Sequence, residues 1–447
     1  MRGIAYFLMF LAMLPAAFSA APAAMMLWVW TTLAAPQAYI FGPLAGLPYN
    51  KIVVFVGVFA LMIDRGRKRL YFDTYFVLLT LFMIQAALSF TFGLTATDRT
   101  YELADKAWKI YLLCLFAAAT LQGRLQVHLL VIAICLGAGV HGIIEGIKFL
   151  LSGGGHIVVP SSVFGDNNSF GLFMLMTVPL LIYLRQYSAA PVVRLGTTAG
   201  VLLNLVGIVA TGSRGAFIGM VAVTLAMIQQ SRRKFVIIVT ILAIAGGLAY
   251  VTPTRLYERA DSIRSADQSD SFMSRVMSWK MNTLLALDRP LVGGGFSAME
   301  DPKVFSRYIG QFGLLDILPT DVPVITRAAH SIYFEVLGDL GFSGLVLFLG
   351  ILVSAFWNLR AVRRETFGRP ALQWAFDLAG YLRLAMIAYA VSGAALSVAY
   401  SELAFVMFTL VSALRKIVSE EVIAKRPVSA RSLTASRADE AGVIARL

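Results

Sequence analysis

Long apolar runs separated by short polar turns occupy most of the chain. Each run has the length that a helix needs to cross about 30 Å of hydrocarbon. The runs lie at 74–92, 104–121, 126–150, 168–185, 193–211, 213–230, 234–251, 331–356, 378–398 and 401–414, with a shorter one at 51–63. The first 36 residues hold one bent segment or two short ones, broken by Pro15 and Pro22. The pattern predicts an all-α polytopic membrane protein with about 12–13 transmembrane helices.

Composition agrees with lipid as the solvent. Hydrophobic residues make up 58% of the chain and charged residues 14%, with a mean hydropathy of +0.76, whereas a soluble domain carries about 25% charged residues. No polar linker divides the apolar runs, so residues 1–417 are predicted to form one integral membrane domain. The polar residues 418–447 are predicted to be a disordered cytoplasmic tail.

Basic residues gather in loops at alternate ends of the apolar runs, and such loops face the cytoplasm. These are 65–69, Arg124, Arg185 with Arg194, 232–234, Arg360 with 363–364, and 415–416. The segments 93–103, 152–167, 211–215 and the long loop 252–329, which precedes the last three spans, are then predicted to be periplasmic. This distribution accounts for the net charge of +13 without a nucleic-acid partner.

The N-terminus has a second interpretation. Arg2, the apolar run and the small residues at 17–20 resemble a cleavable signal peptide. Cleavage there would place the basic cluster 65–69 outside, so the orientation rule favours a retained N-terminal segment.

Arg214 stands in a Thr-Gly-Ser-Arg-Gly-Ala turn between two apolar runs, on the predicted outer face. Ser213 can cap the following helix. A helix N-terminus beside a guanidinium makes an anion site, which would suit a phosphate. The alternative is an interfacial arginine that extends toward lipid headgroups.

His330 lies where the long outer loop meets the next apolar run. Read as a helix, Ser331, Glu335 and Asp339 recur every four residues and form one polar stripe beside it. A neutral imidazole is suited to move a proton near neutral pH. His330 is therefore a candidate catalytic base, with Tyr333 and Glu335 as candidate substrate-binding residues. The alternative is a structural histidine.

Within the long loop, Arg275 and Trp279 are four residues apart and share a helical face, with Lys280 beside them. Arginine can hold a phosphate with two parallel hydrogen bonds, although a solvated surface arginine is an equal alternative. Trp279 and Lys280 are candidate substrate-binding residues beside it. The glycines 293–295 offer backbone amides to an anion, or simply form a turn.

Three weaker candidates complete the set. Lys106 and Lys109, at the outer start of a span, could attract a pyrophosphate or extend toward headgroups. Asp166 precedes an outward helix end, where capping is the simpler role. The chain has no Walker motif, no His/Cys cluster at metal spacing and no Gly-x-Ser-x-Gly elbow, so we expect neither a cofactor nor a metal.

The segments 211–216, 274–279, 290–295 and 330–341 follow, in order and spacing, the signature of the O-antigen ligase/polymerase superfamily, and the resemblance covers roughly 50 to 415. Other features resemble the branch called O-glycosylation ligases associated with exosortase A systems. They are the segment 27–30, Lys106, Lys109, and the segments 153–155 and 166–168. Ser331 departs from relatives that often carry Asn there.

The resemblance implies a metal-independent, inverting glycosyltransferase in the bacterial inner membrane. Its donor would be a glycan on undecaprenyl pyrophosphate, and its acceptor a lipid or a protein. Arg214 and Arg275 would hold the pyrophosphate, and His330 would activate the acceptor hydroxyl. Two alternatives remain: a repeat-unit polymerase of the same superfamily, and a transporter, against which stand the absence of internal repeats and the gathering of charges at one face.

Overall fold

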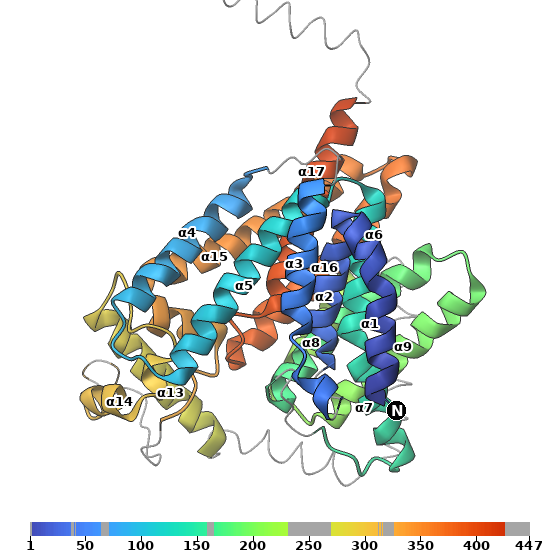
Figure 1. The fold of residues 1–447 in the computed structure, drawn as a ribbon. Helices are drawn as coiled ribbons and strands as arrows, with labels where there is room; N and C mark the ends of the chain where they lie inside the picture. Colours follow the sequence, from blue (N-terminus) through green and yellow to red (C-terminus); the bar gives the residue numbers. More distant parts are fainter. Residues whose placement is uncertain are drawn as a thin grey trace, which may run out of the picture.

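The computed structural model describes residues 2–36, 40, 42–63, 71–158, 165–230, 270–311, 313, 315 and 326–424. Within these ranges 82% of the residues are helical and none form strands, as the all-α prediction requires. Figure 1 shows a bundle of helices with α13 and α14 at one end.

The longer helices follow one another along the chain in this order: α1 (Arg2–Ser19), α2 (Ala21–Ala34), α3 (Tyr49–Ile63), α4 (Thr74–Thr91), α5 (Asp98–Thr120), α6 (Arg124–Gly137), α7 (Gly139–Leu151), α8 (Asn167–Tyr187), α9 (Pro191–Ala210), α10 (Arg214–Gln230), α13 (Asp270–Asp288), α14 (Pro302–Tyr308), α15 (Ile332–Thr366), α16 (Gln373–Ser392) and α17 (Glu402–Ala424). Short 3₁₀ turns are η2 (Pro43–Gly46), η4 (Ala298–Glu300), η6 (Pro370–Leu372) and η7 (Gly393–Ala395).

Six of the described stretches are long and apolar enough to cross a membrane: Thr74–Thr91, Arg124–Leu151, Asn167–Tyr187, Pro191–Ala210, Ile332–Thr366 and Pro370–Ala395. The predicted span 234–251 and the basic clusters 65–69 and 232–234 lie outside the described residues. The total of about twelve spans therefore stays a prediction.

The first 36 residues form two helices rather than one bent segment. α1 ends at Ser19, and α2 begins directly after Ala20 with Pro22 in its first turn, where proline is tolerated. Tyr6 of α1 stacks on Trp30 of α2 with ring centroids 5.3 Å apart. The two helices thus pack on each other as a hairpin.

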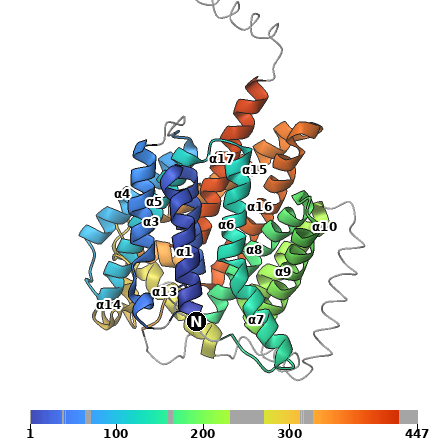
Figure 2. The ribbon, with the colours of Figure 1, turned by 45° about the vertical axis from the view of Figure 1, so that its right-hand side comes forward.

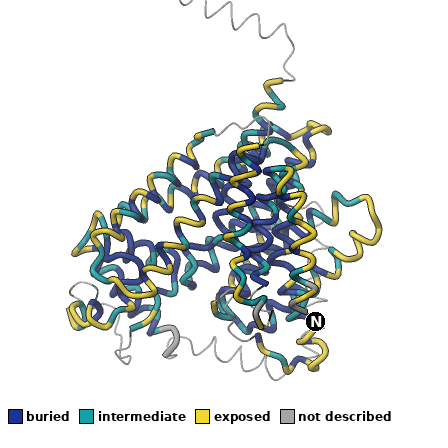
Figure 3. Tube along the Cα trace, in the orientation of Figure 1, coloured by how far each residue is buried: buried dark blue, intermediate teal, exposed yellow. Residues whose placement is uncertain are grey.

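The core lies where α8, α16 and α17 pass through the middle of the bundle, as the buried traces in Figure 3 show. Outer helices leave large apolar side chains exposed: Phe55 and Met62 on α3 are 77% and 79% exposed, and Val192 on α9 is 81% exposed. Apolar patches of this extent mark a surface that meets lipid.

Basic side chains tie helix ends together at the end of the bundle opposite α13. Arg124 lies over the Trp374 ring, 5.4 Å from its centroid, and Arg363 donates to Gln230 at 2.8 Å. Arg415 pairs with Glu365. These three arginines belong to loops predicted to be cytoplasmic, and the side of the membrane that they face stays a prediction.

Two helices run past their predicted ends. α15 reaches Thr366 instead of 356, and α17 continues to Ala424, so the prediction of disorder from 418 onward is wrong for its first residues. The buried Val418 and the contact of Lys416 with the Tyr71 ring, 4.3 Å from its centroid, hold this last part of α17. Residues 425–447 lie outside the described residues.

The long outer loop has a small core of its own. Side chains of α13, η4 and α14 form a cluster of Met277, Met281, Leu285, Ala298, Met299, Val304 and Phe305. α13 rests directly on α15, where a Cβ added at Gly338 would lie 1.9 Å from the Asn282 side chain. The part of the loop that the structure describes is therefore a folded cap on the start of α15.

The glycine run 293–295 fastens this cap to a break in α15. Gly341 has φ 73°, which a side chain rarely adopts, and interrupts the helical hydrogen bonds. The freed carbonyls of Gly338 and Asp339 accept from the amides of Gly294 (2.9 Å) and Gly295 (3.0 Å). The prediction that these amides could bind an anion is wrong, because both already donate hydrogen bonds to carbonyls of α15.

Candidate functional site

His330 is held at the start of α15 by a seryl hydroxyl from a distant loop. Its amide donates to Ser397 Oγ at 2.7 Å, and its φ of 49° lies in the left-handed region. Few residues other than glycine adopt this region unless their surroundings compensate. Ser397 therefore fixes the direction in which the His330 imidazole leaves the backbone.

Arg214 and Arg275 approach His330 from two other helices. Arg214 is the first residue of α10, and Arg275 lies on α13. Burial, and secondly the Arg275 charge, lower the pKa of His330 below its ordinary value. Burial and then the Arg214 charge lower the pKa of Arg275. Arg275 is thus close enough to act on His330 and to be acted on by Arg214.

The start of α10 meets the start of α15 through the turn η7. A Cβ added at Gly219 on α10 would lie 1.9 Å from Ser392 Oγ, and one at Gly393 would lie 2.7 Å from Ile332 Cδ1. Glycines at both contacts allow this close approach. Ser213 Oγ accepts from the Ala216 amide at 3.1 Å, which confirms the predicted helix cap next to Arg214.

Asp166 brings a carboxylate to the same place. It caps α8 by accepting from the Ser169 amide at 2.7 Å, and Asn167 donates to the Thr211 carbonyl at 2.8 Å. Burial by itself would raise the pKa of Asp166, but hydrogen bonds from Ser169 and Asn168, with a smaller effect of His330, outweigh it and lower the pKa. The predicted cap is confirmed, and the carboxylate also acts on His330 and Arg275.

Arg327 is a further cation at the site, and no motif in the sequence pointed to it. It donates to Ser274 Oγ at 3.1 Å, next to Arg275, and it adds to the lowering of the pKa of His330. Its position three residues before His330, on the predicted outer face, is the signal that could have identified it. Ser397 carried no such signal, because only folding brings it to His330.

The acidic stripe of α15 points into the protein. Glu335 accepts from the Ala399 amide at 2.9 Å. Asp339 accepts from the Ser297 amide at 2.9 Å and from the Tyr400 hydroxyl at 3.1 Å. Glu335 therefore anchors the same loop whose Ser397 holds His330.

Most of the other predicted substrate-binding residues contact side chains or backbone of the protein itself. Tyr333 donates to the Ala390 carbonyl at 2.9 Å. Trp279 stacks on Phe334, with centroids 5.3 Å apart and planes 11° apart. Lys280 is buried on α13 with 5% of its surface exposed. Lys106 pairs with Glu402 at 3.1 Å, and Lys109 pairs with Asp105; both line a separate groove on α5.

The structure thus brings together His330, Arg214, Arg275 and Asp166, with Arg327 beside them. An imidazole of lowered pKa is neutral near neutral pH and can accept a proton. Fixed guanidiniums bind a phosphate and stabilise negative charge that develops on it. The arrangement can bind a phosphorylated substrate and remove a proton next to it.

Comparison with known families gives two matches. Residues 199–349 match the O-antigen ligase family, Wzy_C, and residues 1–189 match a family of unknown function, DUF5935. A search of curated proteins found no match. The ligase match includes Arg214, Arg275 and His330, whereas Asp166, Lys106 and Lys109 lie in the other region. The match to the O-antigen ligase family over residues 199–349, in a multi-pass helical protein, supports an enzyme that ligates or polymerises glycans in a membrane.

Proposed function

Given an O-antigen ligase domain over residues 199–349, we propose that this protein transfers a glycan from undecaprenyl pyrophosphate to a lipid or protein acceptor. The transfer would take place on the periplasmic face of a bacterial inner membrane, in the branch associated with exosortase A systems. The observation that carries the proposal is the electrostatic chain from Arg214, at the start of α10, to Arg275 on α13 and from Arg275 to His330, just before α15.

In the proposed reaction the two arginines hold the donor pyrophosphate. The acceptor oxygen attacks the anomeric carbon from the side opposite the leaving group, which inverts the configuration. The bond between that carbon and the pyrophosphate oxygen breaks, and its electron pair stays on the pyrophosphate. Arg214 and Arg275 stabilise this charge without a metal. The acceptor proton passes to His330, a step that typically contributes about 10²–10⁴-fold.

The charges around His330 support a base whose pKa rises when the substrate binds. Without substrate, burial and Arg275 lower the pKa of His330 and keep the imidazole neutral. A bound pyrophosphate would offset the Arg275 charge, and the affinity of His330 for a proton would then rise. Asp166 would stabilise the imidazolium that forms, since its carboxylate raises the pKa of His330.

A polymerase that joins one repeat unit to another fits the same family match and could use the same residues. The two activities differ in their products. A ligase adds one preformed glycan to an acceptor, whereas a polymerase yields a ladder of repeats on the lipid carrier.

The test is transfer in vitro from purified undecaprenyl-pyrophosphate glycan to lipid and protein acceptors, with chelator present and ATP absent. Wild type is compared with Arg214→Ala, Arg275→Ala and His330→Ala at equal folded amounts. The matched control is Arg307→Ala, an exposed arginine of α14 in the same loop.

We expect transfer by wild type and the control, and at least about a hundredfold less by the other three, the low end of what a general base or a group that stabilises developing charge contributes. His330→Ala should still bind the donor, because both arginines remain. A ladder of repeats on the lipid carrier would show that the protein is a polymerase rather than a ligase. Full activity of His330→Ala would refute the proposed site.

A further inference from the structure

A groove of about 680 Å³ lies between α2, α3 and α5. This volume is within the range of about 300–1,000 Å³ that is usual for ligand sites. Its lining includes Trp28 of α2, the start of α3 and the middle of α5, and Glu402 of α17. Figure 2 shows α3 and α5 on the side of the bundle away from α10, which carries Arg214. The groove is therefore separate from the His330 site.

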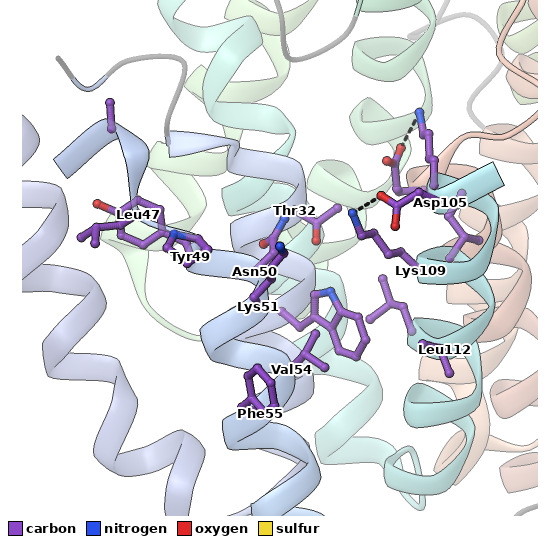
Figure 4. Close-up of a pocket in the computed structure, with 17 residues that line it drawn as sticks. Thr32, Leu47, Tyr49, Asn50, Lys51, Val54, Phe55, Asp105, Lys109 and Leu112 are labelled. Carbon is purple, nitrogen blue, oxygen red and sulfur yellow. Dashed lines mark hydrogen bonds and ion pairs between the residues drawn. The ribbon is translucent and has the colours of Figure 1, made fainter. Parts of the chain in front are cut away.

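The groove has a polar end and an apolar end. Figure 4 shows Thr32, Asn50, Asp105 and Lys109 at one end and Val54, Phe55 and Leu112 at the other. Lys51 and Lys106 also line it. The three lysines and the carboxylates of Asp105 and Glu402 leave one positive charge, and no ion pair joins Lys51 to a described residue. An anionic group would complement this end.

Two buried polar atoms of the groove have no hydrogen-bond partner among the described residues. They are Thr32 Oγ1 and Asn50 Oδ1. A buried polar group that lacks a partner costs about 1–3 kcal/mol, so native structures rarely leave one unsatisfied. A phosphate oxygen could accept from the Thr32 hydroxyl, and a ligand hydroxyl could donate to Asn50 Oδ1. The polar end therefore suits a headgroup that carries both a phosphate and a hydroxyl.

The apolar end continues onto the surface of the bundle. Phe55, Phe59 and Met62 are 77%, 51% and 79% exposed. Their spacing of four and then three residues places them on one face of α3, with Phe55 in the groove lining and the other two farther along the helix. Leu112, half exposed on α5, faces the same groove. An acyl chain leaving the groove would find an apolar path along α3.

We propose that this groove binds an anionic glycerophospholipid of the surrounding bilayer. Its phosphate lies at Lys51, Lys106 and Lys109, its headgroup hydroxyl donates to Asn50, and an acyl chain follows α3. Basic pockets between membrane helices bind anionic lipid headgroups in this way. A polyprenyl phosphate is the weaker candidate, because it lacks a headgroup hydroxyl for Asn50 and the donor pyrophosphate is assigned to the arginines across the bundle.

The groove is connected to the His330 site by one short loop. Lys106 pairs with Glu402, the first residue of α17. The residues just before Glu402 include Ser397, which holds His330, and Ala399, which Glu335 holds. A headgroup phosphate would compete with Glu402 for Lys106. It would therefore act on one end of the loop whose Ser397 positions the His330 imidazole.

The test measures binding and needs no enzymatic activity, so it does not depend on the proposed function. Delipidated protein is titrated with phosphatidylglycerol or with phosphatidylcholine of the same chains, and bound lipid is counted by native mass spectrometry. The variants are Lys51→Gln with Lys109→Gln, and Leu112→Trp, which fills the apolar end. The matched control is Lys148→Gln, an exposed lysine of α7 that pairs with Glu145 as Lys109 pairs with Asp105.

We expect wild type and the control to prefer phosphatidylglycerol, and the double lysine variant to lose about tenfold in affinity for it. Leu112→Trp should bind both lipids more weakly. All variants should unfold at the wild-type temperature, because the changed side chains are exposed. Equal binding of the two lipids, or full binding by the double variant, would overturn the proposal. So would displacement of phosphatidylglycerol by equimolar undecaprenyl phosphate.

Discussion

Removal of the Ser397 hydroxyl isolates the contact that orients the proposed base. In Ser397→Ala the His330 amide loses its acceptor at 2.7 Å. An unpaired amide costs about 1–3 kcal/mol, and the lower part of that range applies to this half-buried site. The left-handed backbone of His330 costs a further ~1–2 kcal/mol that nothing then compensates. The backbone will therefore relax away from the conformation that aims the imidazole.

If the active conformation becomes about 1.4–3 kcal/mol less stable than the relaxed one, its population and the rate fall roughly ten- to a hundredfold. The assay is glycan transfer at saturating donor, together with donor affinity and thermal unfolding. We expect kcat to fall while the donor Kd stays, because Arg214 and Arg275 are untouched. Ser397→Thr keeps the hydroxyl and should restore most of the rate.

A uniform loss of stability, donor binding and rate would show that Ser397 only supports the fold. Wild-type turnover by Ser397→Ala would refute the reasoning, since His330 would then hold its position without this hydrogen bond.

Two other perturbations test the site and the cap. Arg275→Gln removes a charge that lowers the pKa of His330, so the pKa of His330 should rise. The acid limb of the pH profile of kcat/KM should then move to higher pH. An unmoved limb in an active variant would show that Arg275 does not act on His330. Gly341→Ala should lower the free energy of unfolding by at least about 2 kcal/mol, the upper end of the cost of a left-handed alanine, because φ is 73° and a Cβ would lie 2.6 Å from the Pro290 carbonyl oxygen. Thermal unfolding measures this loss, and a wild-type midpoint would contradict the role given to Gly341.

The local sequence was informative where a side chain acts on its own helix. Ser213 and Asp166 were predicted as helix caps and are caps, because the atoms concerned are only three residues apart. The stripe of Ser331, Glu335 and Asp339 follows from helical spacing alone. Spacing did not reveal that Glu335 and Asp339 are buried and fasten two other segments.

Contacts across the chain explain most of what the sequence analysis missed. Ser397 lies 67 residues after His330, and nothing in its own neighbourhood distinguishes it from other serines. The glycines 293–295 read as a possible anion site until the break at Gly341 supplied carbonyls for their amides. The tail prediction failed because Val418 is covered by tertiary contacts that polar composition does not reveal.

The sequence by itself determined that this chain is an all-helical membrane protein, and it identified Arg214, Arg275 and His330 as candidates. The first follows from apolar length against bilayer thickness. The candidates follow from charge at the membrane edge for Arg214 and His330, from helical spacing for Arg275, and from the family resemblance for their joint role. Only the tertiary structure decided that Arg275 lies within electrostatic range of Arg214 and His330, that Asp166 and Arg327 act on His330 as well, and that Lys106 and Lys109 line another groove. Those outcomes depend on how helices pack, which is set by contacts between residues far apart in the chain.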